Sequence, residues 1–425
     1  MKAVIAAGGK GTRISSVASD IPKPMIDICG KPVLERQIMC LASQGITDLI
    51  ITVGHLASVI TDYFGDGSRW GVKIEYYNES QPLGSAGALY KIKDRLDGDF
   101  LLLNADALFD VDFARFIAYH KKKGGLVTLF THPNSHPYDS GLVVTDKNGS
   151  VVRWLTKEDD RSGYFENRVN AGIHIISPEV LKGDVNGQKI DLDRQILKPL
   201  AGSGKMFAYD SPEYVKDMGT PERYYAVCRD FEEGRVQARN LKKKQKAIFL
   251  DRDGTINKYV GFLTDINDFE LIDGVSGAIK RINDSGYLAI VATNQPVIAR
   301  GEVSEEELHE IHAKMQTLLG ADGAYLDGIY YCPHHPHKGY AGERAEYKID
   351  CDCRKPKAGM LFKAAEDFNI DLRSSWMVGD GENDVLCGRN GGCRTAIIGK
   401  NALADIEGND LADCVDKILS GKYEK

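Results

Sequence analysis

The chain has 425 residues, and its 54 lysines and arginines against 61 aspartates and glutamates give a formal net charge of −7. This length exceeds what one hydrophobic core usually organises, so we expect two or three domains. The mildly acidic balance disfavours a nucleic-acid partner, and no apolar run approaches the ~18 residues that a membrane span needs.

The first predicted element is an apolar strand over residues 2–7, which leads directly into a glycine-rich turn formed by Gly8, Gly9 and Gly11. Glycines let the backbone approach a polyphosphate closely and aim its N–H groups at it, so the turn predicts a phosphate site. Two prolines hold Lys23 near the turn, where it and Arg13 could neutralise triphosphate charge as pyrophosphate departs. Alone, such a turn is a weak signal, because it matches neither a Walker loop nor a GxGxxG fingerprint.

Two carboxylates of the first half stand at the boundaries of predicted elements. Asp106 ends an apolar run that begins at Phe100, and Asp217 precedes a turn. Carboxylates far apart in sequence can converge on a divalent metal that bridges phosphates, because hard cations prefer oxygen ligands. In isolation, Asp217 would more often cap the helix predicted to begin at Thr220-Pro221.

Taken in order, the short motifs of the first half resemble those of the sugar-1-phosphate nucleotidyltransferases over about residues 1–230. The closer match is to the heptose 1-phosphate guanylyltransferase branch, and it is carried by residues 16–25 and 30–32. The other motifs lie at residues 8–13, 81–87, 104–106, 169–172 and 216–221.

The resemblance implies a role for each matched residue. Gly8, Gly9 and Gly11 would hold the nucleotide, Gln81 and Gly84 would lie near the base, and Arg13 and Lys23 would contact phosphates. Asp106 and Asp217 would bind Mg²⁺, while Asn170 and Lys157 would face the sugar phosphate. Attack of the sugar phosphate on the α-phosphorus would then need no covalent enzyme intermediate, because metal and cations stabilise the departing pyrophosphate.

Two positions depart from the family pattern: Ala105 stands where glycine is common, and Thr156 stands where glutamate is common. These departures keep open a regulatory first half that binds a sugar nucleotide without turnover. The sequence does not identify the base, so GTP is favoured on the resemblance, and CTP, UTP or ATP with another sugar or polyol phosphate stay as alternatives.

A basic run at residues 239–246 is the clearest break in composition. It follows a helical stretch at residues 221–233 and precedes an apolar run, and basic runs of this kind are usually solvated linkers or helix ends. We therefore predict two domains, residues 1–240 and 246–425.

The second half opens with an apolar run at residues 246–250, which predicts a buried parallel strand ending at Asp251 and Asp253. Two carboxylates that point the same way from a strand end could divide the work, one attacking phosphorus and the other handling a proton. A second predicted strand ends at Thr293 and Asn294, at the edge where open α/β sheets place ligands.

Next come Cys332, His334, Cys351 and Cys353, in two pairs of like spacing. Three thiols and one imidazole complete a tetrahedral ligand set with no position for water, so Zn²⁺ there would be structural. The alternative is ordinary packing, since free cysteine behaves as a small hydrophobe. His335 and His337 are competing ligands, ranked lower on the family match alone.

Lys355 would supply positive charge to the nucleophile and the phosphoryl group, and a third strand ends at Asp380, which could hold Mg²⁺. These pieces resemble the haloacid dehalogenase superfamily and, within it, the heptose 1,7-bisphosphate phosphatases, over about residues 246–400. The motifs are FLDRDGTIN, TNQ…IARG, CPHH, CDCRKPKAGM and GD…D. Departures are Pro296 and Val297 for Ser-Gly, and Gly381 for lysine.

This second resemblance implies Asp251 as nucleophile, Asp253 as general acid and base, and Mg²⁺ held by Asp251, Asp380 and the carbonyl of Asp253. Thr293, Asn294 and Lys355 would bind the transferring phosphate, and Arg300 and Arg354 would bind the rest of the substrate.

The alternation of strands and helices predicts two α/β domains with mainly parallel sheets. The two resemblances imply that the first is a Rossmann-like nucleotidyltransferase with a mixed, mainly parallel sheet and the second a haloacid dehalogenase-type Rossmannoid with a zinc-binding loop. We expect a bifunctional enzyme that makes heptose 1-phosphate and then a nucleoside-diphosphate heptose, with Mg²⁺ in both domains. Reduced cysteines and no recognised export signal predict the cytoplasm. A homo-oligomer is compatible with the sequence.

Overall fold

The computed structural model describes residues 1–9, 21–183, 187–339 and 341–423. The chain divides into two compact units. The first unit comprises Met1–His132, Val143–Leu155 and Asn170–Asn240. The second comprises Pro133–Leu142, Thr156–Val169 and Leu241–Lys425, so two short segments of the first half of the chain belong to it.

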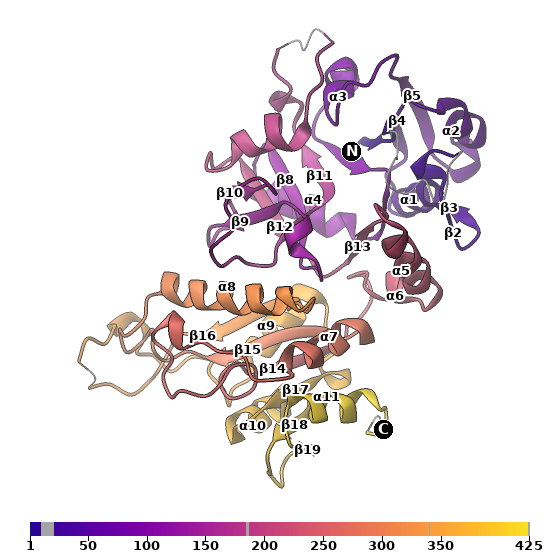
Figure 1. The fold of residues 1–425 in the computed structure, drawn as a ribbon. Helices are drawn as coiled ribbons and strands as arrows, with labels where there is room; N and C mark the ends of the chain where they lie inside the picture. Colours follow the sequence, from indigo (N-terminus) through magenta and orange to yellow (C-terminus); the bar gives the residue numbers. More distant parts are fainter. Residues whose placement is uncertain (10–20, 184–186, 340, 424–425) are drawn as a thin grey trace. The chain divides into compact units, whose positions relative to one another are not determined.

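Among its described residues, the first unit is built on a nine-stranded sheet in the order β10-β9-β11-β6-β1-β4-β5, with β8 joining β11 to β12 (Figure 1). The pairs β1–β4, β1–β6, β4–β5 and β8–β12 are parallel, whereas β11 runs antiparallel to β6 and β9. The strands are β1 (Ala3–Ala6), β4 (Asp48–Val53), β5 (Lys73–Asn78), β6 (Phe100–Asn104), β8 (Val127–His132), β9 (Leu142–Thr145), β10 (Val151–Leu155), β11 (Val169–Ile176) and β12 (Met206–Asp210).

Helices cover both faces of this sheet, because its central strands are apolar on both sides and buried. One apolar layer joins the sheet to α1 (Val33–Ala42), α2 (Ala57–Phe64) and α4 (Phe113–Lys123). The opposite layer joins it to α3 (Gly87–Ile92) and to a π-helix at Leu192–Leu197. A third, smaller cluster packs α5 (Pro221–Glu232) and α6 (Arg235–Ala238) beside two small sheets, β2 (Asp27–Ile28) with β3 (Lys31–Pro32) and β7 (Ala107–Asp110) with β13 (Tyr214–Asp217).

The second unit has a six-stranded, wholly parallel sheet in the order β16-β15-β14-β17-β18-β19, as far as the described residues extend (Figure 1). Its strands are β14 (Ala247–Leu250), β15 (Leu288–Asn294), β16 (Gly328–Cys332), β17 (Trp376–Gly379), β18 (Arg394–Ile398) and β19 (Ile406–Gly408). The first strand of the unit, β14, therefore lies at the centre of the sheet, between β15 and β17.

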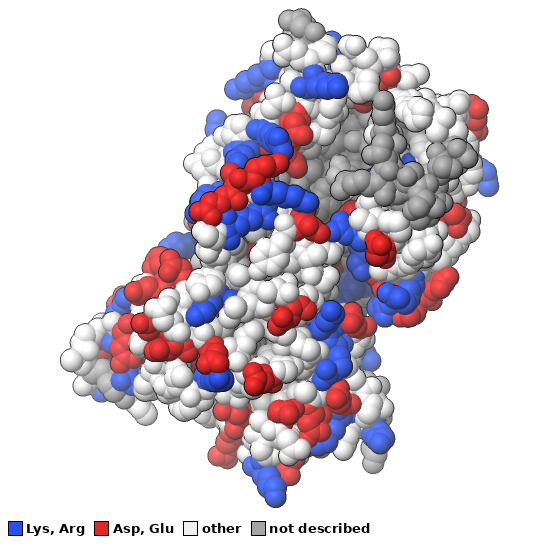
Figure 2. Space-filling model, viewed as in Figure 1, with Lys and Arg blue, Asp and Glu red and all other residues white. Residues whose placement is uncertain are grey.

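Alternate side chains of these strands enter two apolar layers, which gives the unit three layers in all. One face packs against α7 (Val275–Ser285), α8 (Glu305–Ala321) and α11 (Leu411–Leu419). The other packs against α9 (Gly359–Phe368) and α10 (Glu382–Gly391). On the face drawn in Figure 2, basic and acidic side chains of this unit are interspersed.

The predicted fold class is confirmed: both units are α/β, and the sheet of the first is mixed and mainly parallel. In the part of the chain that the structure describes, none of the helices combines the length and apolar character that crossing a membrane requires.

Candidate active sites

The centre of the second unit is a cluster of three acids at the carboxyl ends of two adjacent strands. Asp251 follows β14 and Asp380 follows β17, and the parallel register pairs Leu250 with Val378. Asp384 joins them from the first turn of α10, where its Oδ2 accepts a hydrogen bond from the Gly381 amide. One oxygen of each acid lies within 4.8 Å of the others.

Lys355 lies among these acids with its side chain 3% exposed. Its Nζ is 2.7 Å from Oδ1 of Asp251 and donates to Oδ1 of Asp384 at 2.6 Å. The ammonium balances one carboxylate charge of the three, so the ionised cluster carries two uncompensated negative charges. A divalent cation fits this excess charge and the oxygen donors, which are the ligands that Mg²⁺ prefers.

The electrostatics of the cluster follow from burial and crowding. Burial raises the pKa of Asp251, the neighbouring Asp384 raises it further, and Lys355 opposes both. Burial and then the charge of Asp251 raise the pKa of Asp380. Burial works against the charge of Lys355, but Asp251 and Asp384 outweigh it and raise the pKa of the ammonium. The backbone of Gly254 packs closely against Asp380, and a Cβ at position 254 would overlap Oδ2 of that carboxylate.

Asp253 has different neighbours from Asp251. Its carboxylate accepts hydrogen bonds from Arg252 Nη2 at 2.9 Å, Gln295 Nε2 at 2.8 Å and Asn257 Nδ2 at 3.1 Å. Arg252 is fully buried, and its Nη1 lies 3.2 Å from Nε2 of His312. Asp253 is therefore held by a set of hydrogen-bond donors of its own, separate from the Lys355 contact of Asp251.

The end of β15 organises the surroundings of Lys355. Asn294 makes a two-way bond with the Lys355 backbone, donating from Nδ2 to the carbonyl at 3.1 Å and accepting from the amide at Oδ1 at 3.0 Å. Thr293 accepts from Gln295 Nε2 at 3.0 Å. The guanidinium of Arg300 stacks 4.2 Å from the ring centre of Phe262, and Arg354 donates to the His334 carbonyl at 3.1 Å.

The cysteine pairs converge on one point. The Sγ of Cys353 is 3.2 Å from the sulfurs of Cys332 and Cys351, and those two are 3.4 Å apart. Nδ1 of His334 is 3.4 Å from Cys353 Sγ and 3.8 Å from Cys332 Sγ. These separations are too long for a disulfide, at about 2.05 Å, and near the ~3.8 Å between sulfurs that share one zinc ion. Among the residues described, the four-residue cluster includes neither His335 nor His337.

Several predicted residues of the first unit also lie at or just beyond strand ends. Gly8 and Gly9 follow β1, and the predicted Gly11 and Arg13 lie outside the described residues. Lys23 Nζ is 3.4 Å from Oδ2 of Asp106, which follows β6. Asp217 ends β13 opposite Ala107, so it lies one residue from Asp106 across the ladder.

The alternative role of Asp217, as the cap of the helix that begins at Thr220-Pro221, is wrong. Thr220 is the capping residue and accepts from the Arg223 amide at 3.4 Å. Asp217 instead accepts from the Gly219 amide at 2.9 Å and from Arg223 Nη1, which is 3.0 Å from both of its oxygens. The Asp217 carboxylate is therefore paired with a guanidinium of opposite charge.

The remaining predicted residues of the first half occupy three places. Gly84 has φ +84°, and a Cβ there would lie 2.4 Å from the Ile190 carbonyl, so only glycine fits this turn; Gln81 is exposed nearby. Asn170 lies at the start of β11. Lys157 belongs to the second unit, where its Nζ is 4.0 Å from Asp139.

Three residues of the second unit's site, Asp384, Arg252 and Gln295, have no role assigned from the sequence alone. The signal for Asp384 was its position four residues after Asp380, which places it in the first turn of the following helix. Arg252 and Gln295 lie inside the FLDRDGTIN and TNQ motifs, but their hydrogen-bond partners are supplied only by the fold.

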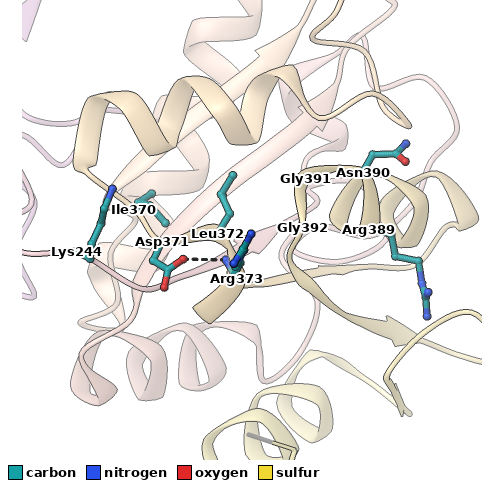
Figure 3. Close-up of a pocket in the computed structure, with 9 residues that line it drawn as sticks. All are labelled: Lys244, Ile370, Asp371, Leu372, Arg373, Arg389, Asn390, Gly391 and Gly392. Carbon is teal, nitrogen blue, oxygen red and sulfur yellow. Dashed lines mark hydrogen bonds between the residues drawn. The ribbon is translucent and has the colours of Figure 1, made fainter. Parts of the chain in front are cut away.

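A pocket of about 470 Å³ in the second unit is lined by residues outside the acid cluster (Figure 3). Arg389, Asn390 and Gly391 line it at the last turn of α10, and Lys244 and Arg373 line the other side. The helix has ten residues and therefore spans about 15 Å. Because Asp384 is in its first turn, this pocket and the acid cluster lie at opposite ends of the helix.

Each half of the chain is similar to known proteins. The nucleotidyl transferase family matches residues 2–234, and a HAD-hydrolase-like family matches residues 352–418. The chain is 45% identical over 173 residues to the D-glycero-beta-D-manno-heptose-1,7-bisphosphate 7-phosphatase of Haemophilus ducreyi, covering 40% of this chain and 92% of that protein.

Two transferases are similar to the first half. The UTP–glucose-1-phosphate uridylyltransferase of Synechocystis sp. is 35% identical over 260 residues, covering 58% of this chain and 66% of that protein. The mannose-1-phosphate guanylyltransferase of Mycobacterium tuberculosis is 32% identical over 235 residues, covering 55% and 65%. The names of these two relatives differ in both the nucleotide and the sugar.

Proposed function

We propose that this chain, which belongs to the nucleotidyl transferase family and carries a haloacid dehalogenase-type phosphatase as its second half, is a bifunctional enzyme of heptose activation. The second half would convert a heptose 1,7-bisphosphate to the 1-phosphate. The first half would join that product to a nucleotidyl group, with GTP favoured, and release pyrophosphate. Each reaction would use its own domain, for which we keep the bounds 1–240 and 246–425 as proposals.

In the phosphatase, an oxygen of Asp251 would attack the 7-phosphorus, and the bond from phosphorus to the sugar oxygen would break. Asp253 would give a proton to that leaving oxygen and later take one from the water that hydrolyses the aspartyl phosphate. Lys355 lies 2.7 Å from the nucleophile and would stabilise charge on the phosphoryl oxygens. Thr293 and Asn294 would complete the phosphate site, with Arg300 and Arg354 turned to the rest of the sugar.

In the transferase, an oxygen of the sugar 1-phosphate would attack the α-phosphorus in line, and the bond to pyrophosphate would break. Gly8, Gly9 and Gly11 would hold the nucleotide, with Gln81 and Gly84 beside the base. Lys23 and Arg13 would stabilise charge on the phosphates. Asn170 and Lys157 would position the sugar phosphate.

Metals complete the proposal. Asp251, Asp380 and the Asp253 carbonyl would hold Mg²⁺ in the phosphatase, beside Asp384, and Asp106 with Asp217 would hold it in the transferase. When bound, the ion would neutralise phosphate charge and orient the oxygens. Zn²⁺ at Cys332, His334, Cys351 and Cys353 would be structural, and the close approach of these four donor atoms supports it. The contact between Cys353 and Cys332 lowers the pKa of the Cys353 thiol and raises that of the Cys332 thiol, as expected when two close sulfurs share one proton.

The observation that carries the proposal is the meeting of Asp251, Asp380 and Lys355 at the end of β14 and β17. Two assays on the purified chain test it. Heptose 1,7-bisphosphate with Mg²⁺ should release one phosphate per sugar, and heptose 1-phosphate with each of the four nucleoside triphosphates should release pyrophosphate fastest from GTP. No phosphate from the first assay would refute the phosphatase, and no pyrophosphate from any nucleotide would favour the regulatory reading of the first half. A faster reaction with UTP, CTP or ATP would replace GTP in the proposal.

A further inference from the structure

His174 makes a contact that a straight strand would not allow. It lies in β11 and is 1% exposed, and its Nε2 is 2.9 Å from Oδ1 of Asn170 on the same strand. Residues four apart on an extended strand are separated by about 13 Å. Gly172, at φ +72°, bends the backbone between them, and a Cβ there would lie 2.5 Å from Asn104 Nδ2. The bend therefore folds Asn170 back over the strand toward His174.

The contacts of Asn170 fix the oxygen end of its amide. Its Oδ1 accepts from the Gly172 amide at 3.2 Å and from His174 at 2.9 Å, so both lone pairs of the oxygen are used. Its Nδ2 has no partner among the residues that the structure describes, and the side chain is half-buried. Within the described residues, the two N–H donors are thus the unpaired end of an amide whose oxygen is held.

Packing alone does not account for a histidine at position 174. Burial lowers its pKa to about 4, so the imidazole is neutral near pH 7. Because Oδ1 of Asn170 can only accept, Nε2 carries the proton, which leaves Nδ1 as a bare acceptor. That Nδ1 is buried without a hydrogen-bond partner in the described part of the chain. An unpaired buried polar atom is unfavourable, and a phenylalanine would fill the site without one.

The position of the pair connects it to the proposed transferase site. In the antiparallel ladder of β11 and β6, Ile173 pairs with Leu103. Asn170 is three residues before Ile173, and Asp106 is three residues after Leu103, so both extend beyond the same end of the ladder. Asn170 and Asp106 therefore follow the ladder at the same end of the sheet, where Lys23 Nζ is 3.4 Å from Oδ2 of Asp106.

We propose that His174 is a positioning residue, which holds the Asn170 amide so that its Nδ2 donors face the phosphate or hydroxyl oxygens of a bound sugar 1-phosphate. The inference rests on the proposed transferase activity of the first half. It concerns the sugar phosphate alone, so the nucleoside triphosphate should bind independently of His174.

The test separates KM for the sugar phosphate from KM for GTP. His174→Phe should raise KM for heptose 1-phosphate by about three- to tenfold, the usual effect of one lost hydrogen bond, and leave KM for GTP unchanged. His174→Gln, which can restore a donor near the position of Nε2, should recover most of the loss. The matched control is His120→Phe, because His120 is also buried in this unit at 2% exposed but bonds to Thr128 and Asp99.

A double mutant gives a second measurement. In an Asn170→Ala background, His174→Phe should cause no further rise in KM, and calorimetric binding of heptose 1-phosphate should show the same lack of additivity. An unchanged KM in His174→Phe, an equal rise in His120→Phe, or a full further rise in the Asn170→Ala background would each overturn the inference. A wild-type chain that makes no pyrophosphate would instead contradict the proposed function, and the inference would fall with it.

Discussion

Removing the ammonium of Lys355 should destabilise the second unit as well as inactivate it. The Nζ lies 2.7 Å from Asp251 and 2.6 Å from Asp384, with both partners largely buried. At an effective dielectric constant of ~20, each contact is worth about 6 kcal/mol of attraction before desolvation is subtracted. Measured losses on removing one partner of a buried pair are about 3–5 kcal/mol, and we expect Lys355→Met to lower the free energy of unfolding by this amount in chelator.

A double-mutant cycle shows whether the loss comes from unpaired carboxylates. Asp384→Asn should stabilise the Lys355→Met variant, because it removes a charge that has lost its partner, although it should destabilise the wild type. The expected coupling is about 2 kcal/mol or more. Lys348→Met is the matched control, since Lys348 is also buried and pairs with Glu343 at 3.2 Å. Its effect should add to that of Asp384→Asn.

Calorimetry and denaturant unfolding of the full chain, following the transition of the second unit, give these energies. Phosphate release by Lys355→Met should fall by about 100-fold or more, because the stabilising charge beside the nucleophile is lost. A destabilisation below about 1 kcal/mol together with an additive cycle would show that the buried pair is not what holds the acid cluster.

Three further predictions concern single groups. Asp251→Asn should abolish phosphate release and leave pyrophosphate release from supplied heptose 1-phosphate within about twofold, because the nucleophile serves one domain; loss of both would argue against separate sites. Cys351→Ala should lower both the zinc content and the melting temperature of the second unit. Cys414→Ala, at a buried cysteine outside the cluster, should keep its zinc. Equal zinc content in the two variants would show that the cysteine cluster only packs and does not bind metal. The folded-state pKa of Asp380 is raised, so in chelator its contribution to stability is lost as the pH rises from the ordinary carboxyl pKa of about 4 through the raised value. Asp380→Asn should therefore be more stable than the wild type at pH 7.5 and not at pH 4. An equal difference at the two pH values in denaturant unfolding would contradict that shift.

The sequence predicted the architecture and the places where chemistry-bearing residues would gather, because both follow from local patterns. Asp251, Asn294 and Asp380 each follow an apolar run, and parallel strands bring such positions to one edge of a sheet. The cysteine pairs were predictable for a similar reason, since two spaced pairs form a ligand set once the chain between them folds back.

What the sequence could not supply were partners set by the fold. Arg252 lies between two acids in sequence, and nothing local indicates that it is fully buried against His312 and Gln295. The bend at Gly172 likewise brings Asn170 to His174 against the spacing expected of a strand. The assignment of residues 133–142 and 156–169 to the second unit had no signal in composition, because it depends on contacts distant in sequence.

The most direct test of the two proposed reactions is a phosphorus NMR time course of the purified chain with heptose 1,7-bisphosphate, GTP and Mg²⁺. We predict loss of the 7-phosphate signal with appearance of inorganic phosphate, followed by conversion of the remaining sugar phosphate signal into a diphosphate linkage with pyrophosphate. Formation of the diphosphate linkage while the 7-phosphate stays in place, or no change in either signal, would contradict the account.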